Sequence, residues 1–400
     1  MTSQSKSICL ISNGLSEKNL RLQPWRYLHE TAHQLARLGY SVTLVSDGAT
    51  RKPIQATLKG VDIERLSVVS EPAWGKNKPL RQTIGRIKPD IILLHVGLTS
   101  FLYQQLDRWQ DIPSVGIFTS PMYSPAELLR LGLPKLARGY RLSAVHVIGT
   151  FLPKLRLRRA MRKGSLRQLV VQSAATGQRL IECGLRQDQI YTIPPGVDGI
   201  WNTRLDGGST RARLGYRSQD IVILYFGSPA QLRGLHTLIR AVELAGQTNP
   251  SIKLLVLSRR RTDELITEDT ELGKLLSRSV VGSQVKVVNG YLDEHALVEH
   301  VAACDIVALP FELVPSDAPL SLLEAQALGK PVVTTAVGCL PELVAQGTGY
   351  IAEPADAVSL ACKLRQAAQE LIGRPQPDMH IQTRSWNQVG AEWSQLIQSL

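Results

Sequence analysis

The chain has 400 residues, which is too long for one ordinary domain and makes two domains the first expectation. Hydrophobic residues make up 44% of the chain and charged residues 20%, which is typical of a globular protein and excludes wholesale disorder. The net charge is +12, and no apolar run approaches the roughly 20 residues that a membrane-spanning helix needs.

The cysteines indicate the redox compartment. All five are far apart and form no C-x-x-C pair: Cys9, Cys183, Cys304, Cys339 and Cys362. Such a pattern is typical of reduced, mostly buried thiols in a cytoplasmic protein. The short apolar stretch near the N-terminus is interpreted as a first strand, not as a secretory signal.

Strand and helix signals alternate along the first half of the chain. Helices are predicted at 24–39, which begins at Pro24 and ends at Gly39, at 81–88, and between the strands expected at 170–174 and 190–198. Short apolar runs predict strands at 7–12, 41–48, 61–68, 89–97, 113–120, 170–174 and 190–198. Strands separated by helices predict a parallel sheet of the Rossmann-like type.

The same alternation restarts after a stretch that is rich in Gly, Arg and Asp. The further strands are expected at 220–228, 251–258, 284–288, 305–311, 330–338 and 349–353, and the helices at 234–245, 294–304, 320–329 and 385–400. The sequence therefore predicts an α/β protein with two Rossmann-like domains, at 1–200 and 219–385, joined by a linker at 201–218. Ligands of open α/β sheets bind at the carboxyl ends of the strands, so a cleft between the two domains is the expected site.

A helix that begins at Pro319 and Leu320 is the first candidate element of the site. Its N-terminus offers unpaired amides and the positive end of the helix dipole, which suits a phosphate. Glu324 lies one turn inside this helix, where its carboxylate can accept hydrogen bonds from two ribose hydroxyls. The alternative is a glutamate that merely complements the helix dipole.

The loop after the strand at 220–228 is the second candidate element. Gly227 and Ser228 turn the chain, and Arg233 stands just before the next helix. A guanidinium at that place can hold a pyrophosphate with two parallel hydrogen bonds. The alternative is an ordinary surface arginine in a loop.

An ordered series of motifs resembles the nucleotide-sugar glycosyltransferases of family 4, which have the two-domain GT-B fold. In chain order these motifs are IPPGVD, FGSPAQLRGLHTLIRA, GYLDEHALVEHVAACDIVALPF, PLSLLEAQALGKPVVTT and GCLPELVAQGTGYIAEPAD. The resemblance is best between Ile193 and Ala357. In such proteins the final helix, here 386–400, returns to pack on the N-terminal domain.

The resemblance implies roles for the matching positions. It places Glu324 on the donor ribose and Arg233 on the donor diphosphate. Gly14 would lie in the loop near the phosphates and the acceptor. The remaining positions implied to bind the donor are Gly227, Ser228, Pro319, Leu320 and Ser321.

Several positions depart from the family pattern. The first member of the family's glutamate pair is here Ser316, and the following Asp317 is a candidate to replace its contact with a sugar hydroxyl. Ser228 stands in place of an arginine, and Pro319 stands in place of a glycine. On the acceptor side, a family histidine falls at Thr119 or Ser120, and His95 is a candidate to serve there.

The implied activity is retaining transfer of a sugar from a nucleoside diphosphate to a glycan or lipid-linked acceptor, in cell-envelope or polysaccharide biosynthesis. The type is a hexosyltransferase that needs neither metal nor cofactor, which agrees with the lack of a D-x-D motif, and UDP-sugars are favoured over GDP-sugars. The alternatives are a phosphorylase or synthase on the same fold, and a non-catalytic subunit that binds a nucleotide or glycan.

All of the excess positive charge lies in one segment. Residues 128–181 contain twelve Lys and Arg and no Asp or Glu, whereas the rest of the chain is balanced. This segment is interpreted as a contact with an anionic membrane surface or lipid-linked acceptor at the inner face of the membrane. A solvated helix face stays open as an alternative, and nucleic acid is disfavoured because no nucleic-acid motif accompanies the charge.

One metal-binding motif is set aside. His29, Glu30 and His33 match H-E-x-x-H, but the helix follows the first strand of a Rossmann-like sheet and no third ligand suggests itself. No metal site is therefore predicted.

Overall fold

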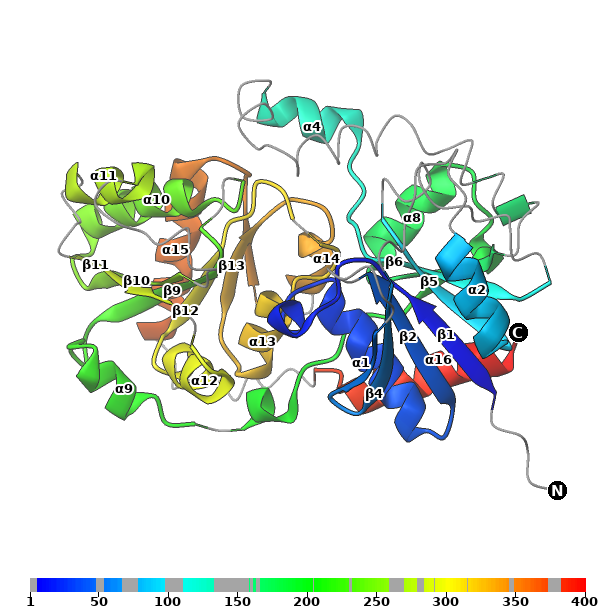
Figure 1. Ribbon diagram of the computed structural model, residues 1–400. Coiled ribbons are helices and arrows are strands. Elements are labelled where there is room, and N and C mark those ends of the chain that lie inside the picture. The colour runs from blue at the N-terminus through cyan, green and yellow to red at the C-terminus, as the bar shows by residue number, and fades with distance from the viewer. Residues whose placement is uncertain are drawn as a thin grey trace.

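The computed structural model describes residues 6–47, 54–66, 78–97, 111–132, 158, 161–162, 166–203, 205–229, 232–258, 270–278, 284–290, 292–314, 316–344, 349–372 and 383–400. These residues form two α/β domains side by side, each built on its own sheet (Figure 1). The prediction of two Rossmann-like parallel-sheet domains is confirmed. Their exact bounds stay a prediction.

The first sheet has eight strands in the order β3-β4-β2-β1-β5-β6-β7-β8. They are β1 (Ser7–Ile11), β2 (Ser41–Asp47), β3 (Ile54–Leu58), β4 (Val61–Leu66), β5 (Ile91–Val96), β6 (Ser114–Phe118), β7 (Leu166–Val171) and β8 (Ile190–Thr192). All pairs are parallel except β3 with β4. Strand β3 was not predicted; it is an edge strand whose hairpin turn is made by Lys59 and Gly60 with φ values of 45° and 82°.

Helices cover both faces of the first sheet. Along β1, Ile8 and Leu10 pack on one face while Cys9 and Ile11 pack on the other, and all four are buried. Apolar side chains on both faces explain why these strands read as unbroken apolar runs. The helices of this half are α1 (Trp25–Arg37), α2 (Lys78–Ile87), α4 (Pro125–Leu131) and α8 (Ala174–Glu182), with short 3₁₀ turns at Glu17–Asn19, Gln187–Gln189 and Gly199–Asn202.

The second sheet has six parallel strands in the order β11-β10-β9-β12-β13-β14. They are β9 (Ile221–Gly227), β10 (Ile252–Ser258), β11 (Val285–Asn289), β12 (Ile306–Leu309), β13 (Val332–Thr335) and β14 (Gly349–Ala352). The helices are α9 (Gly208–Arg213), α10 (Leu235–Thr248), α11 (Glu271–Arg278), α12 (Glu294–Ala302), α13 (Leu320–Ala327), α14 (Leu340–Val344) and α15 (Ala357–Ile372). The segment expected as a linker thus contains α9.

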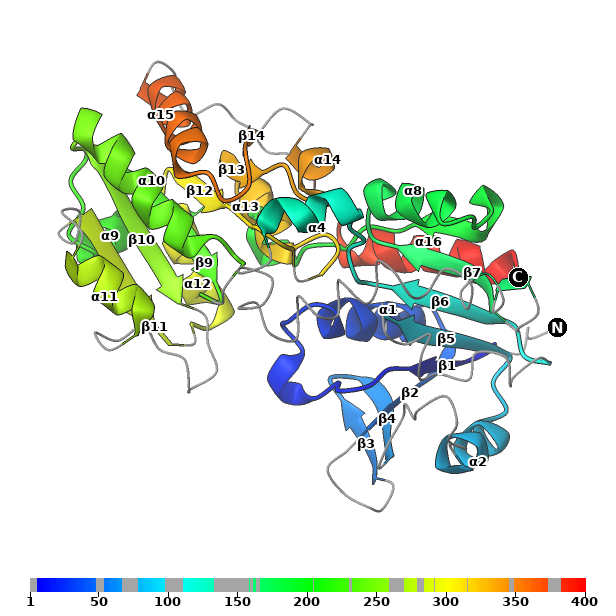
Figure 2. The ribbon, with the colours of Figure 1, turned by 90° about the horizontal axis from the view of Figure 1, so that it is seen from above.

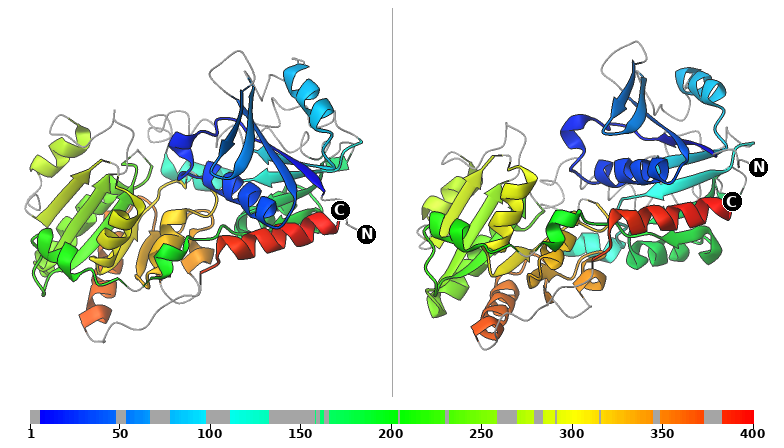
Figure 3. Two further views of the ribbon diagram at one scale, coloured as in Figure 1. Left: turned by 60° about the horizontal axis from the view of Figure 1, so that its bottom comes forward. Right: turned by 90° about the horizontal axis from the view of Figure 1, so that it is seen from below.

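The last helix, α16 (Trp386–Gln398), lies on the first domain although its sequence follows the second. It runs along α1, as both views of Figure 3 show, and buries Trp386, Val389 and Trp393 in the core that Ile8 and Leu10 also line. Where the chain crosses back, the amide of Val197 donates to the carbonyl of Arg384 at 2.8 Å. The two chain segments that cross between the domains, near Val197 and near Arg384, therefore lie side by side.

The helix α4 belongs to the first half of the sequence but contacts the second domain. Seen from above, it lies over the gap between the two domains (Figure 2). Tyr123, Leu128 and Leu131 join the apolar cluster of the second domain. The amide of Val314 donates to the Tyr123 hydroxyl at 2.7 Å, which ties this segment to the loop after β12.

The composition led us to expect reduced, mostly buried cysteines and no membrane-spanning helix. All five cysteines are free thiols, four of them buried and Cys362 exposed. Among the helices that the structure describes, none is both long enough and apolar enough to cross a bilayer. Most of the basic segment, including residues 133–157, lies outside the described residues, so its expected surface contact is not described.

Candidate functional site

The loops that follow the strands of the two sheets meet between the domains. Loops after β1 and β6 come from the first sheet, and loops after β9, β12 and β13 come from the second. The carboxyl ends of parallel strands are where α/β proteins bind ligands. The candidate residues singled out from the sequence lie near the carboxyl ends of these strands, on the loops that follow them, or at the start of α13.

A hydrogen-bonded chain connects three of the strand ends in the first domain. His95, near the end of β5, has its Nε2 3.0 Å from the Thr119 hydroxyl and its Nδ1 3.3 Å from the Ser12 hydroxyl. Loss of water around the imidazole lowers the pKa of His95 to about 4, so the ring is neutral at pH 7. Thr119 is buried and Ser120 half-buried. The candidates His95 and Thr119 are thus in direct contact.

Gly14 forms the exposed turn after β1 with a φ of +70°, a left-handed conformation that suits glycine. Its amide donates to the Asp47 carboxylate, and its carbonyl accepts from the Asn19 side chain at 2.5 Å. The Trp25 indole donates to the carbonyl of Asn13 at 3.0 Å. These contacts hold the turn rigid while Gly14 stays open to solvent.

The loop after β9 holds Arg233 close to the end of its strand. A Cβ atom on Gly227 would lie 3.5 Å from the Arg233 guanidinium, so this side chain folds back over Gly227. The Tyr225 hydroxyl donates to the Ser228 carbonyl at 2.7 Å. Leu232 has a φ of +68°, and strain of this kind in a residue other than glycine often marks a functional loop.

Gly234 allows this loop to pack against the loop after β12. Its φ is +76°, and a Cβ atom there would lie 1.7 Å from the carbonyl oxygen of Pro310. The carbonyl of Leu232 accepts hydrogen bonds from the amides of Glu312 and Leu313. The two loops therefore form one unit that fixes where Arg233 stands.

The start of α13 is as the sequence predicts, with Pro319 before its first residue, Leu320. Ala318 is fully buried with a φ of +48°, a second strained position beside the candidate residues. The side chains of Leu320, Ser321 and Glu324 are half-buried. Leu320 packs against the core of the first domain, so the N-terminus of α13 faces that domain.

Ser316 and Asp317 are buried, unlike residues of an open site that binds a sugar. Ser316 is 6% exposed, and Asp317 is completely buried. The Asp317 carboxylate accepts from the Ser173 hydroxyl at 2.7 Å and from the Gln172 amide at 3.2 Å. In this arrangement Asp317 contacts the first domain and is closed to a ligand.

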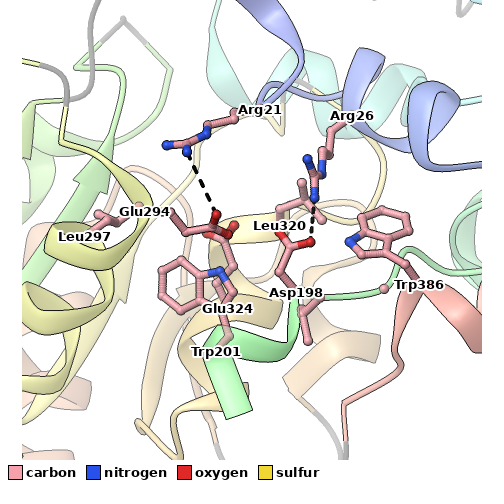
Figure 4. Close-up of a pocket in the computed structure, with 11 residues that line it drawn as sticks. Arg21, Arg26, Asp198, Trp201, Glu294, Leu297, Leu320, Glu324 and Trp386 are labelled. Carbon is pink, nitrogen blue, oxygen red and sulfur yellow. Dashed lines mark hydrogen bonds and ion pairs between the residues drawn. The ribbon is translucent and has the colours of Figure 1, made fainter. Parts of the chain in front are cut away.

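A pocket with an empty volume of about 440 Å³ lies between the domains, and Glu324 and Leu320 line it (Figure 4). The other lining residues come from both domains and both crossings of the chain: Arg21, Arg26, Gly196, Val197, Asp198, Trp201, Glu294, Leu297 and Trp386. Trp201 and Leu297 supply apolar surface beside the Glu324 carboxylate. Arg233 is not among the lining residues that the structure describes.

Two ion pairs cross this pocket. Arg21 of the first domain lies 3.9 Å from Glu294 at the start of α12, and Arg26 pairs with Asp198 (Figure 4). The pKa of Glu294 is raised because burial and the neighbouring Asp198 carboxylate disfavour its charge, although Arg21 and Arg26 oppose this. The pocket thus presents carboxylates and guanidinium groups together, a mixed set that suits hydroxyl and phosphate groups.

Four of the residues that line the pocket were not predicted from the sequence: Arg21, Arg26, Trp201 and Glu294. They stand in three separate segments, and no short motif connects them. The only available signal was the position of Glu294, which follows β11 at the carboxyl end of the second sheet. Their assembly depends on how the two domains face each other.

The H-E-x-x-H motif is part of α1. His29 and Glu30 are buried, and Glu30 lies 3.1 Å from Arg26 in an ion pair. Among the described residues, no cluster of three His, Cys, Asp or Glu side chains has a geometry that suits a metal. Glu30 therefore supports Arg26 beside the pocket.

Comparison with known families accounts for both domains. Residues 25–199 match the family described as Glycosyltransferase Family 4, and residues 220–370 match the one described as Glycosyl transferases group 1. Each of the two domains thus matches a glycosyltransferase family model. The resemblance drawn from the motifs is therefore confirmed.

Named relatives of the chain differ in substrate. A GDP-mannose-dependent monoacylated alpha-(1-6)-phosphatidylinositol monomannoside mannosyltransferase of Corynebacterium glutamicum is 28% identical over 52% of this chain and 55% of its own. A D-inositol 3-phosphate glycosyltransferase of Corynebacterium aurimucosum is 28% identical over 90% of this chain and 87% of its own. The chain spans about half the length of several other curated relatives that it matches.

A solved structure supports the GT-B fold. HepE of Anabaena in complex with UDP superimposes with a TM-score of 0.71 at 18% identity, over 99% of this chain and 100% of that one. At this identity the likeness concerns the fold alone. The expectation of two Rossmann-like domains facing each other across a cleft is confirmed.

Proposed function

We propose that this protein is a retaining glycosyltransferase that moves a sugar from a nucleoside diphosphate to a glycan or lipid-linked acceptor. The observation that carries the proposal is Glu324, one turn inside α13, with its carboxylate in the pocket between the domains. A carboxylate in that place can accept hydrogen bonds from both ribose hydroxyls. The alternative is a non-catalytic subunit that binds a nucleotide or glycan. It is supported by the departures from the family pattern at Ser228, Ser316 and Pro319.

The proposed reaction needs positive charge more than a protein nucleophile. As the bond from the anomeric carbon to the diphosphate breaks, the acceptor oxygen bonds to that carbon and its proton passes to the departing phosphate. Arg233 and the first amides of α13, at Leu320 and Ser321, would stabilise the charge on the diphosphate. Gly14, His95 and Thr119 lie on the acceptor side, and no metal ion or cofactor takes part in the proposed step.

We expect calorimetry to find binding of one nucleoside diphosphate among UDP, GDP, ADP and dTDP. The sequence interpretation favours UDP, and HepE was solved with UDP, whereas the mannosyltransferase relative is named for GDP-mannose. Glu324→Ala should weaken this binding about tenfold or more, because a charge-assisted hydrogen bond is worth about 1.5–3 kcal/mol. The measurement is the Kd of each diphosphate for the wild type and the variant.

The matched control is Glu370→Ala, which removes an exposed carboxylate of α15 outside the pocket and should leave the Kd unchanged. Equal binding by the wild type and Glu324→Ala would place the ribose elsewhere. Absence of binding by every diphosphate would favour the non-catalytic alternative.

We further propose that the protein works at the cytoplasmic face of a membrane. The support is the charge of residues 128–181, with twelve Lys and Arg and no acidic residue. Each Lys or Arg near an anionic surface contributes about 1 kcal/mol. We expect the protein to sediment with vesicles that contain anionic lipid, as the cytoplasmic leaflet does. Binding should be lost in 0.5 M salt and absent with neutral vesicles, and equal binding to both vesicles would contradict the proposal.

A further inference from the structure

The carboxylate of Asp317 joins the two domains at the base of the site. It is completely buried and accepts hydrogen bonds from the Ser173 hydroxyl at 2.7 Å and from the Gln172 amide at 3.2 Å. The amide of Asp317 donates in turn to the carbonyl of Thr119 at 2.8 Å. One residue of the second domain is therefore bonded to the ends of both β6 and β7 in the first.

A second carboxylate completes this contact. Both oxygens of Glu342, in α14, accept from the first two amides of α8, from Ala174 at 2.9 Å and from Ala175 at 2.8 Å. The N-terminus of a helix favours a negative charge, so this placement stabilises the contact. Four consecutive residues of the first domain thus donate hydrogen bonds to two carboxylates of the second.

The contact reaches both halves of the proposed site. On one side, Asp317 stands three residues before Leu320, the first residue of α13. On the other side, Thr119 contacts His95, and His95 contacts Ser12 in the segment that leads into the Gly14 turn. A shift of Asp317 relative to the first domain would therefore move the donor helix relative to the acceptor side.

We propose that Asp317 is a positioning residue, which fastens the loop before α13 to the start of α8 and so aligns the donor and acceptor sides. This inference rests on the proposed transferase function. It replaces the role suggested from the sequence, a contact with a sugar hydroxyl, because the buried carboxylate already has two donors from the protein.

The contact is expected to depend on pH. Burial raises the pKa of Asp317 to about 6 from an ordinary value of 3.8, although Ser173, Thr176 and Gln172 oppose the rise by hydrogen bonding. The other groups that face it are Glu342, whose charge raises its pKa, and three groups that are neutral near pH 7. Those three are the Cys339 thiol, the Tyr123 phenol and the more distant Tyr27 phenol.

The raised pKa of Asp317 determines how the strength of this contact changes with pH. When the contact opens and water reaches Asp317, its pKa returns toward 3.8, so the closed contact binds a proton more tightly than the open one. The contact is then stronger at pH 5.5 than at pH 7.5, by about fourfold for a pKa of about 6. Asparagine, which is always neutral, should remove this dependence.

Hydrogen exchange of the amides at 172–175 in the full-length protein tests the inference. After correction for the intrinsic rates, the wild type should be protected about fourfold more at pH 5.5 than at pH 7.5. Asp317→Asn should keep the protection and lose the pH difference. Asp317→Ala should lower the protection about tenfold at pH 7.5, where the carboxylate is charged, because it removes a charge-assisted bond, and the variant should show no pH difference.

The exposed pair of Asp188 with Arg186 offers a matched control, and Asp188→Asn should behave as the wild type. Unchanged protection in Asp317→Ala, or a pH difference that persists in Asp317→Asn, would overturn the inference. If the alanine variant does not fold, the asparagine variant still decides it. Because this experiment uses no nucleotide, its failure is distinct from a failure to bind a nucleoside diphosphate.

Turnover adds a readout that a merely structural residue would not change. With the donor chosen by the diphosphate panel, Asp317→Ala should lower kcat about tenfold with little change in the donor KM, and Asp317→Asn should restore kcat at pH 7.5. A higher KM at unchanged kcat would instead assign Asp317 to ground-state binding of the donor.

Discussion

Replacing Arg233 with alanine is expected to lower the rate of sugar transfer about 100- to 1000-fold without unfolding the protein, because it removes a group proposed to stabilise the departing diphosphate. The guanidinium lies over Gly227 at the end of β9, on a loop held by Gly234 and the segment after β12. It is half-buried, so its charge is less screened than that of a surface arginine. Release of the nucleoside diphosphate from the sugar donor measures the rate, and thermal unfolding checks the fold.

Two further variants make this expectation specific. Arg240→Ala removes an exposed arginine from α10, the helix that follows the same loop, and should leave the rate unchanged. Arg233→Lys should give an intermediate rate, because lysine keeps the charge but cannot form two parallel hydrogen bonds to a phosphate. If Arg233→Ala transferred sugar as fast as the wild type, the loop after β9 would have no part in binding the diphosphate.

Replacing Trp393 with alanine is expected to lower the free energy of unfolding by about 3–5 kcal/mol, as for other large buried aromatic side chains. Trp393 is fully buried between α16 and the first domain, and its indole donates to the Tyr27 hydroxyl at 3.1 Å. The Tyr27 hydroxyl donates onward to the Ile193 carbonyl at 2.8 Å, just before the first crossing between the domains. Denaturant unfolding followed by circular dichroism measures the loss.

The control for Trp393 comes from the same helix. Gln395→Ala changes an exposed position of α16 and should alter stability by less than about 0.5 kcal/mol. Removal of all of α16 should destabilise the protein further, because the first domain would also lose the apolar contacts of Trp386 and Val389. A Trp393→Ala protein with an unchanged unfolding midpoint would show that α16 adds little to the first domain.

Much of the fold was predictable because its strands are buried on both faces. From Ile8 to Ile11 in β1 and from Ile221 to Phe226 in β9, every residue meets an apolar cluster on one side or the other, so each strand appears in the sequence as a short apolar run. The helices also carry local signals at their ends, such as Pro319 before α13 and the Ser385 cap of α16. The edge strand β3 pairs with β4 alone and was not predicted.

The candidate site was only partly predictable. Arg233, Gly227 and Leu320 follow strands or begin a helix, so their places depend on local structure that the sequence specifies. The family motifs that contain these residues add their expected roles in binding the donor. The contact between His95 and Thr119 also follows from strand order, because β5 and β6 are neighbours in one parallel sheet.

The sequence by itself determined the fold class, the two sheets and the loops that carry the candidate site, because periodicity and caps act over a few residues. Only the tertiary structure decided which side chains line the pocket and that Asp317 faces the first domain. Arg21, Trp201, Glu294 and Glu324 are far apart in the chain and meet through the relative placement of two rigid domains. That placement depends on contacts between distant segments, such as Asp317 with Ser173, which leave no local pattern in the sequence.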